Sequence, residues 1–258
     1  MNKFELTAIS RSLIARRWHV GLLPLVAPAL VLANPSGGQV TAGSAAITTP
    51  NSATTVINQA SDAAIIQWQS FNVGRQEYVI FNQPTASAAV LNRVVGGDAS
   101  LILGHMESNG RVFLINPMGV LFGKGAQVNV GSLVASTLDL ADGDFLQGKY
   151  VFQSAPGSTP AGVVNEGRIV AGQGGYVVLA GDYVKNAGVI TAKLGDIALA
   201  SGSAATLDMN GDGLVNFAVS KAALSDRAGV DNIGKLVADG GTVVMTAQVA
   251  RELMHAAV

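Results

Sequence analysis

The sequence predicts an all-β protein that winds into a right-handed parallel β-helix, with N-terminal capping strands and short β elements outside the helix. Composition is the first observation: 31 of 258 residues are Gly and only 5% are aromatic, which favours many short strands joined by tight turns. The second is a pattern that occurs four times. Repeats of about 20 residues cannot bury an apolar face alone, so they indicate a solenoid of stacked coils. The crossover rule for parallel strands makes the coil right-handed.

The charge and Cys content exclude several classes of protein. Charged residues make up only 13% of the chain, which is too few for a disordered protein. The formal net charge is −1 and becomes −4 when residues 1–33 are left out. Because a nucleic-acid-binding protein would carry a basic stripe, we expect no nucleic-acid partner. The chain has no Cys, so packing and backbone pairing must stabilise it without disulfides.

Residues 1–33 have the features of a signal peptide. Arg16 and Arg17 precede an apolar run over residues 20–33, which two Pro residues interrupt. The run is shorter than the ~20 residues that span a bilayer, and basic residues before a short apolar core are typical of an export signal. Small residues place the cleavage between Ala33 and Asn34, which leaves residues 34–258 as the β-helix domain. The alternative is a short membrane anchor or a buried helix.

Residues 37–81 contain branched and aromatic side chains separated by Gly, Asn, Ser and Thr, which predicts short strands and turns. Ser61 before an apolar run also fits a helix start with an N-cap. Trp68 and Phe71 are bulky enough to plug the open end of a β-helix core. Their alternative role is to stack against a ligand.

Residues 84–111 hold the densest charge in the chain, namely Arg93, Asp98, His105, Glu107 and Arg111. We expect solvated turns here, with Arg93 held by neighbouring carbonyl groups. The alternative is an acid–base site, because β-helical polysaccharide lyases use Asp and Arg. The segment has one His and no companion motif, which favours the turns.

Residues 112–123 consist of two apolar runs separated by Asn116, Pro117, Met118 and Gly119. Asn, Pro and Gly at the first, second and fourth positions favour a type I turn, in which the Asn side chain bonds the backbone ahead of it. The local prediction is strand, turn, strand, with little strand surface left for water.

The repeat Asn-x-Gly-x-(Ile/Leu)-x-Ala supplies the predicted corners of the coils. Its Asn and Gly positions are Asn129, Gly131, Asn165, Gly167, Asn186, Gly188, Asn232 and Gly234. We expect the Gly to allow a left-handed backbone, and the Asn to bond its neighbour in the next coil. The apolar positions Leu133, Ile169, Ile190 and Leu236 should then stack in the core, and a second strand follows most copies.

The copies are spaced by 36, 21 and 46 residues. The step of 21 equals one coil. We interpret 36 as one coil plus an excursion through residues 139–160, and 46 as two coils, with residues 214–219 in the second. Leucine-rich repeats have a similar length, but their Leu-x-x-Leu-x-Leu spacing is missing.

The sequence contains no motif for an enzyme, a cofactor or a metal. Residues 208–213 match the first half of a calcium loop, but Val219 stands where the loop needs an acid, so we expect a plain turn. His19, His105 and His255 have no zinc spacing. Residues 172–175 are rich in Gly but lack the strand-to-helix context of a phosphate-binding loop.

Residues 114–137 read LINPMGVLFGKGAQVNVGSLVAST. This run resembles the secretion-domain signature of two-partner-secreted exoproteins of the filamentous haemagglutinin family. The resemblance extends through residues 80–84, 91–94 and Gly104, and covers most of residues 38–250. It implies a β-helical secretion domain, with a strand rather than a helix before Trp68. The family usually has Asn where Met118 stands, a departure that leaves the turn possible but removes a polar side chain.

The resemblance also implies how the domain works. Sec machinery and signal peptidase would deliver it to the periplasm, where an Omp85-type outer-membrane transporter with periplasmic domains would recognise it. The implied recognition motif is Asn116, Pro117, Met118, Gly119 and Val120. The exoprotein would fold as a β-helix on emerging at the surface of a Gram-negative bacterium, and members of the family usually continue into a long passenger.

Two other functions stay open at this stage. A free-standing adhesin module would bind carbohydrate or a host surface through exposed aromatic side chains, for which Tyr150, Tyr176 and Tyr183 are the candidates. A β-helical polysaccharide lyase would need Asp and Arg clustered on one face.

Overall fold

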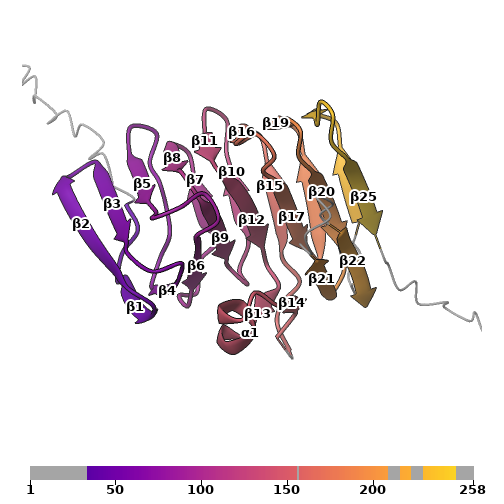
Figure 1. Cartoon of the computed structure of the whole chain (residues 1–258). Coiled ribbons are helices and arrows are strands. Elements are labelled where there is room, and N and C mark those ends of the chain that lie inside the picture. The colour runs from indigo at the N-terminus through magenta and orange to yellow at the C-terminus, as the bar shows by residue number, and fades with distance from the viewer. Residues whose placement is uncertain (1–33, 156, 209–215, 222–228, 248–258) are drawn as a thin grey trace, which may run out of the picture. The chain divides into compact units, whose positions relative to one another are not determined.

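The computed structural model describes residues 34–155, 157–208, 216–221 and 229–247, and all of them belong to one compact unit. In this unit the chain winds through successive coils whose strands stack in parallel sheets (Figure 1). The predicted signal peptide, with Ala33 at its cleavage site, lies outside the described residues. Nearly all of the calcium-like loop, residues 209–213, does so too.

Three sheets form the coils, and a fourth lies outside them. The first long sheet contains, in spatial order, β1 (Gln39–Ala42), β4 (Ala63–Trp68), β6 (Ala89–Val94), β9 (Arg111–Ile115), β12 (Ser132–Ser136), β17 (Val177–Gly181), β20 (Ile197–Ser201) and β25 (Val243–Ala247). The second long sheet contains β2 (Ala45–Asn51), β3 (Thr54–Gln59), β5 (Tyr78–Asn82), β8 (His105–Ser108), β11 (Gln127–Val130), β16 (Arg168–Ala171), β19 (Val189–Ala192) and β24 (Lys235–Val237).

The two remaining sheets are smaller. The short sheet contains β7 (Ser100–Ile102), β10 (Val120–Phe122), β15 (Gly162–Asn165), β18 (Tyr183–Asn186) and β23 (Gly229–Asn232). The outer sheet contains β13 (Asp139–Leu140), β14 (Tyr150–Gln153), β21 (Ala204–Asp208) and β22 (Asn216–Lys221), and the helix α1 (Asp142–Leu146) precedes β14. These are the β elements expected outside the helix.

Equivalent strands of successive coils pair in register, as the solenoid prediction requires. Val177 of β17 is the partner of Ile197 in β20, which in turn is the partner of Val243 in β25. At the other end, β1 and β2 pair antiparallel with β4 and β3. They are the predicted N-terminal capping strands.

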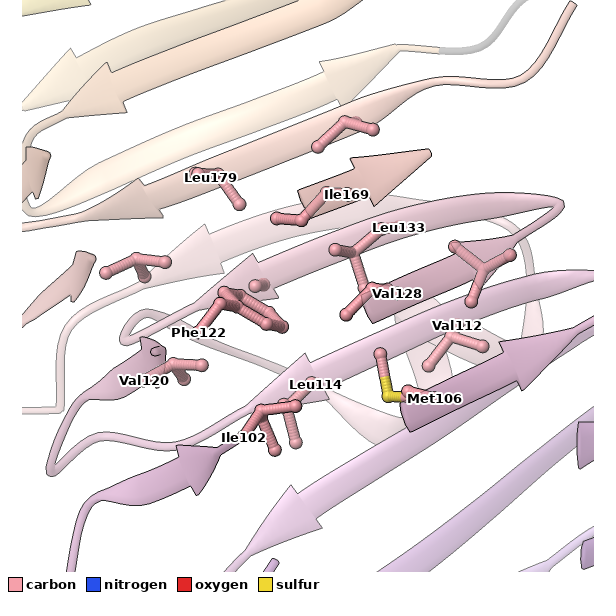
Figure 2. Close-up of a cluster of buried hydrophobic side chains, with 14 of the residues drawn as sticks. Ile102, Met106, Val112, Leu114, Val120, Phe122, Val128, Leu133, Ile169 and Leu179 are labelled. Atoms are coloured by element: carbon pink, nitrogen blue, oxygen red, sulfur yellow. The ribbon is translucent and has the colours of Figure 1, made fainter. Parts of the chain in front are cut away.

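Inward-facing side chains of the three sheets form the main core, which Figure 2 shows for the middle coils. Alternation along β12 places Leu133 and Ala135 in this core and turns Val134 to the opposite face. Val134 is nevertheless buried, because the outer sheet and α1 cover that face and form a second, outer core. The apolar run of β9 is therefore buried on both faces, which explains its lack of polar alternation.

Trp68 and Phe71 lie in the coil next to the capping strands, at the N-terminal end of the main core. Each side chain is 1% exposed, and their rings meet edge to face with 5.5 Å between centroids. Trp68 Nε1 donates a hydrogen bond of 3.0 Å to Asn92 Oδ1 in the following coil. This placement fits the plug, and because β4 is a strand the helical alternative is wrong.

Three of the four predicted repeat copies occupy equivalent corners. Asn165, Asn186 and Asn232 end β15, β18 and β23 and are register partners. The next apolar positions stack as well, since Ile169 pairs with Ile190 and Ile190 with Leu236. Ile169 and Ile190 are fully buried, and Leu236 packs against the core from the last described coil.

The prediction is wrong for the copy that begins at Asn129. Asn129 is exposed in the middle of β11, where its partner is Val170. Gly131 does lie at a corner, but this corner joins the second long sheet to the first, and Leu133 stacks on Val177. Two different corners of the coil carry the same local sequence, because both need a Gly before an alternating strand.

The step of 46 residues between Asn186 and Asn232 is one coil, not two. Strand β23 pairs directly with β18, so no coil intervenes. Residues 216–219 belong instead to β22, which pairs antiparallel with β21 in the outer sheet. The extra length is thus a second excursion, like the correctly predicted one through residues 139–160.

Close approach of the coils, rather than a left-handed backbone, explains the Gly at these corners. Positive φ occurs at other Gly residues, and Gly131, Gly167, Gly188 and Gly234 do not share it. A Cβ on Gly188 would stand 2.1 Å from the carbonyl oxygen of Gly167, and one on Gly234 would stand 2.3 Å from that of Gly188. Neither carbonyl has room to move, because each is part of the stacked backbone.

Candidate functional site

The turn of Asn116, Pro117, Met118 and Gly119 joins β9 to β10, as predicted. Gly119 N donates to Asn116 O at 3.0 Å and closes the turn. Met118 N donates to Asn116 Oδ1 at 2.9 Å, which is the forward bond expected of an Asn side chain. Gly119 has a φ of +118°, a conformation that a side chain would strain.

Asn116 is completely buried and ties this turn to the neighbouring coils. Its Nδ2 donates to Asp98 O and to Ser100 Oγ, both at 3.0 Å. Its backbone N donates to Ser136 O at 3.0 Å on the other side. One amide side chain therefore satisfies a carbonyl, a hydroxyl and a backbone N–H at once, and it holds the turn in a fixed position.

Only the tip of the turn reaches the surface. Met118 is 46% exposed and Pro117 is half-buried, whereas Val120 is buried and pairs with Ser100 and Val163 in the adjacent coils. The turn therefore divides into a buried frame and an exposed apolar tip.

The three stacked corners form a ladder of Asn side chains. Asn165 Nδ2 donates to Asn186 Oδ1, and Asn186 Nδ2 donates to Asn232 Oδ1, both at 2.8 Å. Asn165 Oδ1 also accepts a bond of 3.1 Å from Gly167 N. Contact between Asn side chains of successive coils is thus present where the repeat was placed correctly. The buried position of Asn165 and Asn186 makes the ladder a structural feature.

Arg93 is held by the first excursion. Its guanidinium contacts Asp139 Oδ1 at 2.9 Å and Asp142 Oδ1, and donates to Leu140 O at 2.6 Å. Burial opposes the charge, but hydrogen bonds and Coulombic attraction from Asp142 and Asp139 outweigh it and raise the pKa of Arg93. The expectation of neighbouring carbonyls was therefore incomplete, because two of the three partners are carboxylates distant in sequence. The cluster fastens α1 and β13 to β6.

The other charged residues of this segment lie apart from that cluster. His105 is on the second long sheet, where its ring stacks on Tyr78 with 4.4 Å between centroids. Glu107 is exposed on the same strand, Asp98 is exposed before β7, and Arg111 begins β9. The segment does not bring its acids and bases together.

Two of the three Tyr proposed for ligand binding are buried. Tyr150 and Tyr176 are 6% and 5% exposed in the outer core, where burial raises the pKa of both hydroxyl groups. Tyr183 is half-buried. Among the residues whose exposure the structure describes, the exposed aromatic side chain is Tyr78, at 38%. Its place on an outward position of the alternating β5 was the signal that sequence reasoning missed.

Within the described residues, no group of three or more His, Cys, Asp or Glu is arranged to hold a metal ion. No helix in this part of the chain has the length and apolar character needed to span a membrane.

Comparison with known sequences gives a consistent result. A family model described as the TPS secretion domain matches residues 32–256. The heme/hemopexin-binding protein of Haemophilus influenzae is 37% identical over 177 residues, which cover 65% of this chain and 19% of that protein. A second protein of that name, also from Haemophilus influenzae, is 49% identical over 84 residues. The chain thus spans less than a fifth of the length of these relatives.

Solved structures give the same result at the level of the fold. The HMW1 secretion domain from Haemophilus influenzae has a TM-score of 0.76 and 34% sequence identity, with 83% of this chain and 56% of that chain covered. The filamentous hemagglutinin secretion domain has a TM-score of 0.56 and 19% identity, over 83% and 79% of the two chains, and supports the β-helix fold alone. None of these proteins is named as an enzyme.

Proposed function

Because this chain belongs to the family of TPS secretion domains, we propose that it directs an exoprotein to an outer-membrane transporter that recognises it in the periplasm. Exoproteins of this family pass through the periplasm to the surface of Gram-negative bacteria. The observation that supports a recognition role in this chain is the exposed apolar tip on a rigidly held turn. Because the turn is already held in place by the bonds of Asn116, a partner that covers its apolar tip need not order the backbone, which lowers the cost of binding.

The proposed recognition motif, from Asn116 to Val120, combines two kinds of residue. Asn116, Gly119 and Val120 are buried and set the position of the turn. Pro117 and Met118 face outward and are the residues that the transporter's periplasmic domains contact. The motif thus supplies both a frame and a contact.

The route of export that we propose begins with Sec machinery and signal peptidase, which remove residues 1–33. The chain then crosses the transporter unfolded, and no disulfide opposes this because it has no Cys. Contacts in a solenoid run between neighbouring coils, so coils that have emerged act as a template for the next. Unpaired strand edges also offer the transporter a site for strand addition.

The experiment compares two substitutions that place a carboxylate on equally exposed side chains. Met118 and Leu146 are both 46% exposed, but Leu146 lies on α1 in the first excursion. With the chain and its transporter expressed together, we expect Met118→Glu to lower secretion by at least about tenfold, because a carboxylate in an apolar contact must be desolvated. Leu146→Glu should be secreted at the wild-type level. Met118→Asn should be too, because Asn is the usual family residue and carries no charge that the contact must desolvate.

Thermal melting of the purified proteins is the control. Both Glu variants should have the melting temperature of the wild type, because substitutions at exposed positions away from the core change stability little. Secretion of Met118→Glu at the wild-type level would show that the transporter contacts the chain elsewhere. Mass spectrometry of the secreted wild type should find Asn34 as its first residue, and a start upstream of residue 20 would contradict the cleavage proposal.

A further inference from the structure

A groove crosses the outward face of the second long sheet, which is separate from the recognition turn. Its first half is a hollow of about 570 Å³ whose lining includes Glu107 and Asn129. Its second half is a hollow of about 700 Å³ lined by Arg168, Val170, Gln173, Thr191, Lys193, Leu194 and Asp239, among others. The two halves lie side by side, because Asn129 of the first and Val170 of the second are direct partners in β11 and β16. We propose that this groove binds an acidic polysaccharide.

The second half of the groove carries positive charge. Arg168 and Lys193 are exposed, and within the described part of the chain neither forms an ion pair. Lys235 lies on the same face, in register with Arg168 across β19. The acidic residue of this half is Asp239. With Lys235 beside the hollow, the second half has three cations against one acid, whereas the first half has the carboxylate of Glu107. The positive charge is therefore local to the second half, and there it favours an anionic group of the ligand.

The polar groups along the groove suit the hydroxyl groups of a sugar. Asn129, Gln173 and Thr191 form no side-chain hydrogen bond within the described residues, and neither does the carboxylate of Glu107. Amide side chains donate and accept in one plane, so they can pair with hydroxyl groups of either orientation. The lining residues come from five strands, from β5 to β19, and from the turn after β24. At ~4.8 Å per strand the groove has the length for an extended polymer.

Leu194 adds backbone strain at the same place. It is 57% exposed and has a φ of +53°, which a bulky residue rarely adopts. Gly174 and Gly240 occupy the corresponding turns of the adjacent coils, with φ of +71° and +77°. Leu194 N donates to Asp239 O, and Gly174 N donates to Lys193 O, so the three turns are stacked. Strain that holds an apolar side chain at the rim of a groove points to ligand contact, here with the apolar face of a sugar ring.

Other polymers fit this groove less well. A nucleic acid would need a continuous basic track with aromatic side chains for base stacking, and the positive charge here is confined to one half. A peptide strand would add to a sheet edge, whereas the groove lies on a sheet face. A bilayer surface is flat and would not reach amides that line a hollow.

The test is calorimetric titration of the purified full chain with polygalacturonate and with dextran sulfate, which differ in their acidic group. Uncharged dextran and vesicles of phosphatidylglycerol are the comparison ligands. We expect binding to at least one acidic polysaccharide, weakened by added salt, and no binding to dextran. Failure to bind either acidic polymer, or binding to the vesicles alone, would overturn the proposal.

Matched variants locate the site. Arg168→Gln combined with Lys193→Gln should weaken binding at least about tenfold, the usual effect of losing charged hydrogen bonds. Lys124→Gln combined with Lys149→Gln removes the same charge from exposed positions outside the groove, and should bind like the wild type. Equal losses in the two double variants would show that only net charge matters and would reject the site.

Leu194→Asn provides a second readout. Asn tolerates positive φ, so this variant keeps the turn and removes the apolar side chain. We expect a melting temperature that is kept or raised, and an affinity lowered by about threefold. Wild-type affinity would show that Leu194 does not contact the polymer and would remove the support that its strain gives to the proposal. All of these variants should be secreted normally, because the recognition turn is intact.

Discussion

Asn116 donates two side-chain hydrogen bonds and accepts one at a position that water does not reach. We expect Asn116→Ala to lower the free energy of unfolding by about 2–5 kcal/mol, because several buried polar groups lose their partners together. Urea denaturation of the purified domain would measure the loss. A change below about 0.5 kcal/mol would mean that the turn does not depend on this side chain.

This prediction changes how secretion data should be interpreted. A secretion defect in Asn116→Ala follows from loss of the turn whether or not the transporter contacts Asn116. A secretion defect in Gly119→Val would likewise follow from loss of the turn, because the φ of +118° at Gly119 does not suit a branched residue. Met118 is the residue of the motif that separates recognition from folding, since it is exposed.

Leu194 is a residue at which stability can be gained. A left-handed conformation costs an L-residue roughly 1–2 kcal/mol, and Asn pays less of this cost than other side chains. Leu194→Asn should therefore keep or raise the melting temperature, although it loses the packing of the Leu side chain over Gly240. Differential scanning calorimetry would detect the change. A fall of more than a few degrees would show that the apolar packing outweighs the strain.

At the scale of the coil corner, Gly188 and Gly97 offer a matched pair. A Cβ at Gly188 would stand 2.1 Å from a backbone oxygen, whereas one at Gly97 would meet nothing within 4 Å. Gly188→Ala should lower the free energy of unfolding by more than about 3 kcal/mol, because the stacked backbone cannot move aside. Gly97→Ala should be neutral or stabilise by up to about 1 kcal/mol. Equal effects in urea denaturation would reject close approach as the reason for the corner Gly.

The repeat shows how far the sequence determines the elements. Asn165, Asn186 and Asn232 were placed correctly because their side chains must bond each other from coil to coil. Asn129 was misplaced because the same local pattern serves another corner. Residues 216–219 were misplaced because a hairpin strand of the outer sheet alternates like a coil strand. Local chemistry identifies a corner, but only long-range pairing tells which corner it is.

The same limit applies to the candidate site. The turn at Asn116 was predictable because an Asn-Pro-x-Gly sequence encodes its own geometry. The burial of Tyr150 and Tyr176 was not, because it depends on the outer sheet docking against β12 and β17. The groove was also missed, since its cations come from β16 and from the turn after β19, which are adjacent only through coil stacking.

At the scale of the whole described unit, the outer sheet joins coils that would otherwise touch only their neighbours. Strand β14 belongs to the excursion that follows β12, and β21 belongs to the one that follows β20. The two pair antiparallel along Tyr150–Gln153. The outer core beneath them contains buried side chains from β4, β6, β9, β12, β17 and β20. We therefore expect the coils containing these strands to unfold as one unit, although a solenoid can in principle open coil by coil.

A comparison of two buried Ile residues tests this expectation. Ile190 lies in β19 and Ile57 in β3 near the N-terminal cap, and both are fully buried. Each Ile→Ala change should cost about 2–5 kcal/mol. In native-state hydrogen exchange, each change should lower the protection of β4, β14, β17 and β20 together, because all four strands contribute side chains to the outer core. If Ile190→Ala lowered the protection of β17 and β20 and left β4 unchanged, the coils would open separately, and the outer sheet would not join them.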